Sequence, residues 1–475
     1  MTDLQVDRTM FREYDIRGFV DQNFTGDVLD RLGAALGTFL ASESGGAPGT
    51  VAVGRDVRLS SQRYAAAFID GLRRTGANVI DIGQVPTPLL YFAVNTLHAN
   101  GGGCVTASHN PPEFNGLKAR KRAPGLPNGV PLQPADIQAL FTLAQGGTFR
   151  HAEPGTLAHR DVVDDYVRYV ASQIHLAKPL KVVVDAGNGA AGPVAIQTFT
   201  ALGCEVVPLY CEPDGTFPNH MPDPLKPSNL VDLIAKVKET GADMGIALDG
   251  DGDRLGVVDD AGEILWADQY LILLARDALR DHPGGSVVFD VKCSQGLIDG
   301  IRAAGGVPVM SRTGYPNIMA RRRETNAILA GELSGHTFFN DPVIDFDDGT
   351  FAGANLLAAL SRAGAPLSEI VAGLPKYHAT PEERFYCADD AKFGVIEQMQ
   401  ASLAKEADVL DVTVLDGARV GLEGGWGIVR ASNTEPAITT RFEGVTPQRA
   451  AEIRQWFMDR LGKFPAVNLI DAAGH

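Results

Sequence analysis

The sequence contains few cysteines, and this excludes a protein held together by disulfides and a protein built around a cysteine-ligated zinc site. Only five of its 475 residues are cysteine. Their scattered positions and odd number fit neither a disulfide framework nor the paired spacing of a zinc site. We therefore expect free thiols in a reducing compartment. The five residues are Cys104, Cys204, Cys211, Cys293 and Cys387.

Long apolar runs and an excess of positive charge are also missing. No stretch approaches the roughly 18 apolar residues of a membrane span, and residues 1–8 show no hydrophobic secretory core. The formal net charge of −16 disfavours nucleic acid or an anionic membrane surface as a partner. The sequence therefore predicts a cytoplasmic protein with no nucleic-acid or membrane partner.

What is present is a recurring α/β pattern. Each copy has an apolar run, a helix-length segment, a glycine and a second apolar run. The copies begin at Val51, Val182 and Val287, with helices expected over 61–74, 193–202 and 295–304. Short apolar runs that alternate with helices indicate parallel strands. The predicted fold class is α/β, with three related tandem domains built on mainly parallel mixed sheets.

The last hundred or so residues have a different pattern. Two linkers are expected, at 144–160 and 374–390. Beyond the second, strands are expected over 411–415, 427–430 and 438–442, and a helix over 447–461, which indicates a smaller α+β domain. The predicted domains are 1–153, 154–255, 256–372 and 373–475, and we expect them to surround a central cleft.

Asp249, Asp251 and Asp253 alternate with glycines and are followed by Arg254. Carboxylates this close repel one another, so a cation is expected among them. Hard oxygen ligands on a short turn favour Mg²⁺. A calcium-binding helix-loop-helix is excluded, because it needs glycine where Arg254 stands and glutamate where Asp260 stands. A solvated acidic turn remains the structural alternative.

A second cluster, Thr106–Pro112, follows an apolar run. Ser108 lies where the chain leaves the predicted sheet, and ligands of parallel sheets bind at the carboxyl ends of strands. The adjacent serine and histidine are poorly placed for a catalytic triad, and alone the cluster resembles an ordinary turn. Together with the aspartates, it predicts a serine that carries a phosphoryl group beside Mg²⁺.

Six motifs occur in the order found in one known family. They are Phe11–Gly18, Thr106–Pro112, Asn115–Lys118, Asp249–Arg254, Glu332–His336 and Arg430–Pro436. In these motifs the chain resembles the α-D-phosphohexomutase superfamily, in its bacterial phosphomannomutase/phosphoglucomutase branch. The resemblance runs from about Phe11 to the end of the fourth domain.

The resemblance implies an activity and its cofactors. A phosphohexomutase interconverts hexose 6-phosphate and hexose 1-phosphate, here of mannose or glucose, through a phosphoserine and a hexose 1,6-bisphosphate intermediate. Mg²⁺ would be bound by Ser108, Asp249, Asp251 and Asp253. The partners would be small sugar phosphates, and the chain would act as a monomer or homodimer.

The resemblance also assigns individual residues. Its implied catalytic residues are Ser108, Arg17, His109, Lys118 and Arg254. Its implied substrate-binding residues are Tyr14, Lys292, Tyr315, Glu332, Ser334, His336, Arg430, Ser432, Asn433 and Thr434. Tyr315 departs from the family, whose near relatives carry a histidine there. A tyrosine can donate a hydrogen bond but cannot carry a positive charge.

Other functions are open at this point. The segment 187–192 has the G-x-G-x-x-G pattern of a dinucleotide-binding oxidoreductase, although this leaves the serine, aspartate and C-terminal clusters unexplained. A phosphoglucosamine mutase would use the same scaffold. A phosphatase would use similar groups but would admit water to the phosphoserine. A non-catalytic sugar-phosphate-binding protein would tolerate loss of Ser108.

Overall fold

Short runs of apolar residues form the central strands, because other elements cover both of their faces. In β8 (Lys181–Asp185), for example, the three valines are fully buried. The structure is a computed structural model and describes residues 5–123, 125–403, 405–432 and 436–469. It has two units. The first contains the described residues up to Tyr270 and Ser334–Ala372; the second contains Leu271–Leu333 and the described residues from Gly373 onward.

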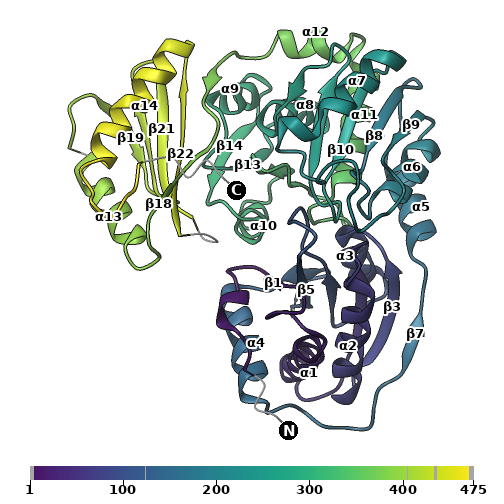
Figure 1. The fold of residues 1–475 in the computed structure, drawn as a ribbon. Helices are drawn as coiled ribbons and strands as arrows, with labels where there is room; N and C mark the ends of the chain where they lie inside the picture. The colour runs from purple at the N-terminus through teal and green to yellow at the C-terminus, as the bar shows by residue number, and fades with distance from the viewer. Residues whose placement is uncertain (1–4, 124, 404, 433–435, 470–475) are drawn as a thin grey trace. The chain divides into compact units, whose positions relative to one another are not determined.

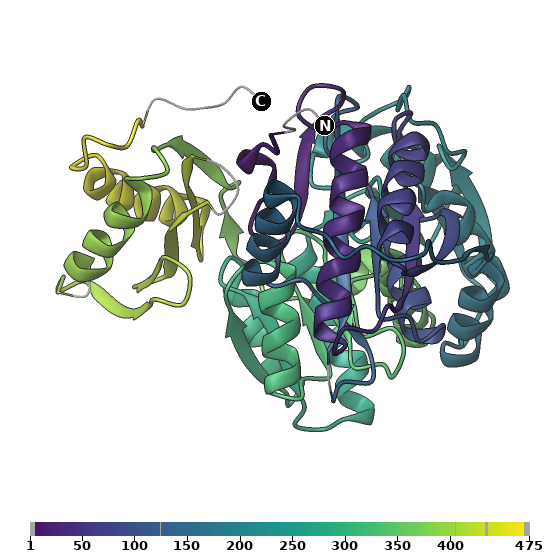
Figure 2. The ribbon, with the colours of Figure 1, turned by 90° about the horizontal axis from the view of Figure 1, so that it is seen from below.

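The first unit begins with a mixed sheet in the order β1-β5-β4-β2-β3-β7, with β6 beside β5. The strands are β1 (Ile16–Phe19), β2 (Thr50–Arg55), β3 (Asn78–Gln84), β4 (Gly101–Val105), β5 (Phe114–Arg122), β6 (Gly129–Pro131) and β7 (Leu157–His159). The helical segments are η1 (Arg8–Met10), α1 (Gly26–Glu43), α2 (Ser61–Arg74), α3 (Thr87–Thr96) and α4 (Pro134–Gly146). Helices α1 and α2 pack side by side (Figures 1 and 2). The β4–β5 turn carries Ser108, and β5 carries Lys118.

A second sheet in the same unit has the order β12-β11-β10-β8-β9. Besides β8, its strands are β9 (Glu205–Leu209), β10 (Met244–Leu248), β11 (Leu255–Asp259) and β12 (Ile264–Leu265). The unit also contains α5 (Val163–Gln173), α6 (Gly192–Ala201), η2 (Pro227–Asn229), α7 (Val231–Thr240), β16 (Thr337–Phe339), α11 (Gly349–Ala363) and α12 (Leu367–Ala372). Strands β8, β9 and β10 are parallel, whereas β10 and β11 form an antiparallel hairpin. The loop of this hairpin is the acidic motif.

The second unit contains a parallel sheet and an antiparallel one. Strands β14 (Val307–Ser311), β13 (Ser286–Asp290) and β15 (Leu329–Gly331) pair in parallel, with α9 (Gln295–Ala303) and α10 (Tyr315–Glu324). Helix α8 (Ala267–Asp281) spans the boundary between the units. The antiparallel sheet contains β17 (His378–Ala379), β18 (Glu383–Tyr386), β19 (Val409–Thr413), β20 (Ala418–Leu422), β21 (Gly425–Ala431) and β22 (Ala437–Gly444), with α13 (Lys392–Leu403) and α14 (Pro447–Leu461).

The predicted α/β fold class is confirmed, including the smaller C-terminal domain, and the structure adds that the sheet of this domain is antiparallel. The two expected linkers are more ordered than predicted. Within 144–160, β7 pairs with β3, and within 374–390, β17 and β18 pair with β22. These strands are two to four residues long, so no alternating pattern marks them. The four domain boundaries stay a prediction. Among the described residues, no helix combines the length and hydropathy that crossing a bilayer requires.

Candidate active site

Three aspartates occupy the hairpin loop between β10 and β11. Asp249, Asp251 and Asp253 are each at most 1% exposed, and one carboxylate oxygen of each lies within 4.8 Å of the others. Asp251 Oδ1 and Asp253 Oδ1 have no hydrogen-bond partner within the described residues. Grouped, buried carboxylate oxygens with spare lone pairs are suitable ligands for a hard divalent cation. The loop can therefore hold a metal ion.

Three backbone N–H groups from other segments hold this loop. They donate to consecutive loop carbonyls: Thr87 to Asp251 at 2.8 Å, Ala190 to Gly250 at 3.0 Å and Gly349 to Gly252 at 3.0 Å. Each donor lies at, or just before, the N-terminus of a helix, namely α3, α6 and α11. Helix N-termini carry partial positive charge. The three helices thus fix the loop and partly offset its carboxylates.

Gly189 and Gly250 allow the neighbouring segments to approach closely. A Cβ on Gly250 would lie 2.4 Å from the carbonyl oxygen of Ser108, and one on Gly189 would lie 2.8 Å from that of Gly250. The second contact belongs to the glycine-rich segment that suggested a dinucleotide site. Gly189 is explained by this packing against the acidic loop, whereas a Cβ on Gly187 would lie 2.9 Å from Pro222 and one on Gly192 would lie 2.3 Å from the carbonyl oxygen of Cys211.

Ser108 follows β4 and faces the acidic loop. Its Oγ donates to Asp249 Oδ2 at 2.7 Å and lies 3.1 Å from His109 Nδ1. The residue is 1% exposed and has a positive φ of 53°, a backbone conformation that costs a non-glycine residue about 1 kcal/mol or more. Residues far apart in the sequence thus place one hydroxyl directly against the predicted metal ligands.

Arg58, which the sequence analysis did not single out, holds the serine loop in place. Its guanidinium group donates to the carbonyls of Ser108 at 2.9 Å, Pro111 at 2.7 Å and Phe114 at 3.0 Å. Arg58 is buried and pairs with Asp56 at 3.1 Å. Its position just beyond the carboxyl end of β2, beside Asp56, was the available sequence signal.

Lys118 is the nearest cation to the aspartates. Its Nζ lies 2.7 Å from Asp251 Oδ2 and also contacts Asp253 Oδ2. Burial alone would lower the pKa of Lys118, but these carboxylates outweigh it and raise that pKa well above its usual value. Burial and the charges of Asp253 and Asp251 raise the pKa of Asp249 to about 8. A further cation within the triad would lower that pKa again.

Arg17, Arg254 and His109 complete the basic side of the site. On β1, Arg17 pairs with Asp15 at 2.7 Å and donates to the Asn110 side chain. Burial would lower the pKa of Arg17, but Asp15 and, further off, Asp251 and Asp253 raise it. Burial, followed by the charges of Arg254 and Arg17, lowers the pKa of His109 well below its usual value.

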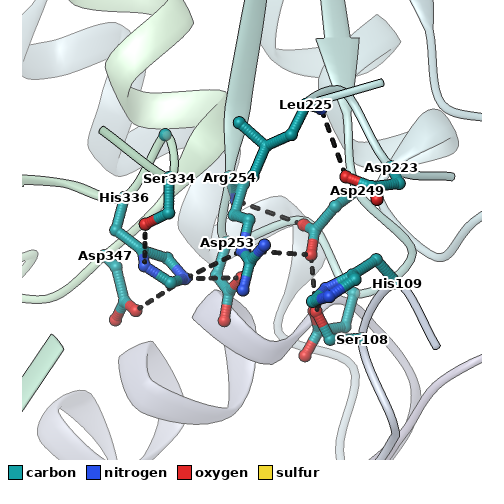
Figure 3. Close-up of polar contacts among 12 residues, drawn as sticks. Ser108, His109, Asp223, Leu225, Asp249, Asp253, Arg254, Ser334, His336 and Asp347 are labelled. Atoms are coloured by element: carbon teal, nitrogen blue, oxygen red, sulfur yellow. Dashed lines mark hydrogen bonds and ion pairs between the residues drawn. The ribbon is translucent and has the colours of Figure 1, made fainter. Parts of the chain in front are cut away.

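Ser334 and His336 lie beside the acidic loop (Figure 3). His336 Nε2 accepts a hydrogen bond from Arg254 Nε at 3.2 Å and lies 3.4 Å from Asp253 Oδ1, while its Nδ1 is 3.1 Å from Ser334 Oγ. Asp347 Oδ2 lies 3.9 Å from the same Nε2. Burial and Asp253 raise the pKa of Asp347 to about 6. The sequence analysis missed Asp347, although it lies in an acidic run over 341–348.

The second unit contains another group of the predicted residues. Lys292 follows β13 and pairs with Glu382 at 3.1 Å. Burial would raise the pKa of Glu382, but Lys292 outweighs it and lowers that pKa to about 2. Arg430 on β21 donates through Nε to Asp416 Oδ2 at 3.1 Å. Neither acidic partner was identified from the sequence.

Asp416 and Glu332 both bind the loop before α10. Asp416 Oδ2 accepts the N–H of Thr313 at 3.1 Å, and Glu332 Oε1 accepts the N–H of Gly314 at 2.6 Å. Tyr315 is the first residue of α10. Within this unit, therefore, the predicted sugar-binding glutamate, Tyr315 and Arg430 are connected through one loop.

The remaining predicted residues are less informative. Tyr14 is partly buried just before β1, and Ser432 is buried after β21, where its N–H donates to Ala437 at 2.8 Å. Asn433 and Thr434 lie outside the described residues. The structure thus brings ten predicted residues together in the first unit: Arg17, Ser108, His109, Lys118, Asp249, Asp251, Asp253, Arg254, Ser334 and His336.

Comparisons with protein families match almost the whole chain. Residues 8–151, 164–262 and 266–377 match the phosphoglucomutase/phosphomannomutase alpha/beta/alpha domains I, II and III, and residues 382–460 match the C-terminal domain of the same family. All four domains occur in the order that the family has.

Individual proteins that are similar to this chain belong to the same family as the matched domains. The chain is 44% identical over 453 residues to the phosphomannomutase/phosphoglucomutase of Pseudomonas aeruginosa, covering 95% of each chain. It is 38% identical to the phosphoglucomutase of Neisseria meningitidis, covering 95% of this chain and 96% of that one. A solved phosphoglucomutase/phosphomannomutase family structure from Burkholderia thailandensis is similar with a TM-score of 0.89 and 40% identity, over 98% of this chain and 99% of that one.

Proposed function

This chain belongs to the phosphoglucomutase/phosphomannomutase family and is a phosphohexomutase; we propose that Ser108 carries the phosphoryl group during its reaction. The contact that supports this role is the 2.7 Å hydrogen bond from Ser108 Oγ to Asp249 in the buried triad. A hydroxyl beside a cation site can accept and return a phosphoryl group.

The proposed reaction has two half-reactions. The O6 hydroxyl of a hexose 1-phosphate attacks the phosphorus of phosphorylated Ser108; the O6–P bond forms, the Oγ–P bond breaks, O6 loses its proton and Oγ gains one. The resulting hexose 1,6-bisphosphate then turns around. Ser108 Oγ attacks the phosphorus on O1, losing its proton as the O1–P bond breaks and O1 gains one. The product is hexose 6-phosphate, and the phosphoserine is restored.

The metal in this proposal is Mg²⁺, bound by Asp249, Asp251, Asp253 and the phosphate on Ser108. When bound, it would neutralise the charge that develops on the transferring phosphoryl group. Two spare, buried carboxylate oxygens support this set of ligands, and so does the oxygen-only chemistry that Mg²⁺ prefers.

The basic residues have a separate task. A phosphoserine adds about −1.5 to −2 charges at neutral pH, on top of the three aspartates. We assign Lys118, Arg17 and Arg254 to balance this charge, and we include Lys118, Arg17 and His109 in the proton transfers. Lys118 is the most strongly supported, because it contacts two of the three aspartates directly.

The substrate would be recognised at both ends. We assign the sugar hydroxyls to Glu332 and Ser334 and the non-reacting phosphate to Arg430 and its neighbours, in keeping with a guanidinium fork that binds phosphate in two places. The sugar is mannose or glucose, with glucosamine as the alternative. Side-by-side assays of the three hexose 1-phosphates, each under the same conditions, would rank them. The cytoplasmic location stays a prediction, supported by five buried free cysteines.

The test is to replace the serine and follow the phosphate. Incubation with hexose 1,6-bisphosphate should phosphorylate the wild-type protein at Ser108, as read by peptide mass spectrometry. Ser108→Ala should remain unmodified there and lose at least about 10³-fold in turnover, while still binding substrate. Ser172→Ala, on the surface of α5, is the control. Wild-type turnover in the Ser108 variant would refute the assignment.

A further inference from the structure

Thr87, at the start of α3, contacts Asp251 in two ways. Its hydroxyl donates to Asp251 Oδ2 at 2.6 Å, and its backbone N–H donates to the Asp251 carbonyl at 2.8 Å. The two residues are 164 positions apart, and both are fully buried. A residue held through both its backbone and its side chain by the same neighbour has little freedom to rotate.

These contacts distinguish the two oxygens of the Asp251 carboxylate. Oδ2 accepts from Thr87 and also lies 2.7 Å from Lys118 Nζ. Oδ1 is buried and has no hydrogen-bond partner among the described residues, and a carboxylate oxygen of Asp251 lies within 4.8 Å of those of Asp249 and Asp253. One oxygen is therefore held by two donors, while the other is available to a cation.

The Thr87 hydroxyl is the donor in its hydrogen bond to Asp251, because an ionised carboxylate oxygen can only accept. Pro86, with φ of −66°, precedes Thr87 and sets the start of the helix.

We propose that Thr87 is a positioning residue for the metal site: its hydroxyl fixes the rotation of the Asp251 carboxylate so that Oδ1 faces the cation. Outer residues that orient metal ligands commonly change metal affinity 10- to 100-fold when they are removed. The inference rests on the metal site of the proposed function and assigns it a residue outside the six-residue acidic motif.

The test compares two substitutions that differ in the hydroxyl. Thr87→Val keeps the shape and the backbone N–H but removes the hydroxyl, whereas Thr87→Ser keeps the hydroxyl. Mg²⁺ affinity is measured by isothermal titration of each full-length protein, and Mn²⁺ affinity by electron paramagnetic resonance. Thr87→Val should weaken binding of both ions about 10-fold or more, and Thr87→Ser should bind nearly as the wild type does.

The control is Thr96→Val, at the other end of the same helix. It removes a hydroxyl that donates to the Phe92 carbonyl at 2.8 Å, so it reports the general effect of losing a threonine hydroxyl from α3. It should leave metal affinity unchanged. Thermal unfolding of all variants separates a local change at the metal site from a loss of folding, and Thr87→Ala replaces the valine variant if that variant does not fold.

Three results would overturn the inference. One is unchanged metal affinity in Thr87→Val. Another is a serine variant that binds metal as weakly as the valine variant, because the hydroxyl would then not be responsible. Failure of the wild-type protein itself to bind either ion would remove the metal site, and the role of Thr87 with it. Only this third result would also count against the proposed function.

Discussion

The ammonium group of Lys118 lies 2.7 Å from Asp251 Oδ2 and also contacts Asp253, so one buried cation serves two buried carboxylates. Lys118→Met would leave those charges without a partner, and breaking a buried pair in this way costs about 3–5 kcal/mol. We expect metal-free Lys118→Met to unfold at a clearly lower temperature than the wild type. Because Mg²⁺ can supply the missing charge, its addition should raise the unfolding temperature more in the variant.

Lys121→Met is the control for this prediction. Lys121 lies on the same strand and pairs with Glu43 at 3.0 Å and Asp136 at 2.9 Å. Its loss should have a smaller effect that does not depend on Mg²⁺. An unfolding temperature of Lys118→Met that responds to Mg²⁺ no more than the wild type does would show that lysine and metal do not share these carboxylates.

Removal of the metal should stop the reaction. A bound cation typically stabilises the transition state by several kcal/mol, and each 1.4 kcal/mol is about a tenfold change in rate. Treatment with a strong chelator should therefore lower turnover by at least about 10²-fold, and added Mg²⁺ should restore it. Asp249→Ala should not recover on Mg²⁺ addition. Full activity in the chelator would contradict the assignment of the acidic loop.

Much of the fold could be predicted because its signals are local. The helix over 61–74 was predicted with its final bounds, since apolar spacing and the following glycine mark it within a few residues. β17 and β18 were missed because each is defined by pairing with β22, more than fifty residues further along the chain. Both strands are too short to show an alternating pattern, and Pro375 and Pro381 lie in the segments before them.

Some residues of the candidate site could likewise be predicted from the sequence, and others could not. Ser108 and the three aspartates lie in short motifs whose residue types have few other uses, so the sequence alone pointed to them. Arg58 and Asp347 do not stand out in the sequence, because arginine and aspartate are common on any surface. Their relevance comes from burial and from neighbours in other segments: the carbonyl of Ser108 lies 50 residues from Arg58, and Asp253 of the acidic loop lies beside Asp347. Only the folded chain shows these contacts.

We expect that Arg430 binds the substrate phosphate through its guanidinium group and that a lysine cannot replace it. Its Nε donates to Asp416 at 3.1 Å, and a guanidinium can make this bond while its terminal nitrogens bind a phosphate. Lysine cannot hold both in a fixed geometry. Arg430→Lys should therefore raise the KM for hexose phosphate about 10-fold or more, equivalent to about 1.4 kcal/mol, with a smaller change in kcat.

Steady-state kinetics with hexose 1-phosphate would measure this effect. Arg454→Lys provides the matched control, because Arg454 pairs with Glu383 at 2.7 Å on the same domain and is not among the proposed phosphate ligands. Its KM should stay at the wild-type value. A similar KM in both variants would remove Arg430 from the proposed phosphate site.

His220 should make stability depend on pH. Its Nε2 lies 3.0 Å from Asp185 Oδ2, and its Nδ1 lies 2.9 Å from the Met221 carbonyl. Burial would lower the pKa of His220, but Asp185 outweighs it and raises that pKa above 6.5. A raised pKa means that the folded state binds the proton more tightly than the unfolded state. The stabilisation is therefore full below about pH 6.5 and is lost as pH rises through the folded-state value.

His220→Gln should lower the urea midpoint most at pH 6 and least at pH 9. A hydrogen bond to a charged group contributes about 1.5–3 kcal/mol, which sets the size of the difference at low pH. His151→Gln, at an exposed position, is the control. It should change the urea midpoint by the same amount at pH 6 and at pH 9. NMR titration of the His220 ring gives its pKa directly, and a folded-state pKa at or below 6.5 would show that Asp185 does not outweigh burial.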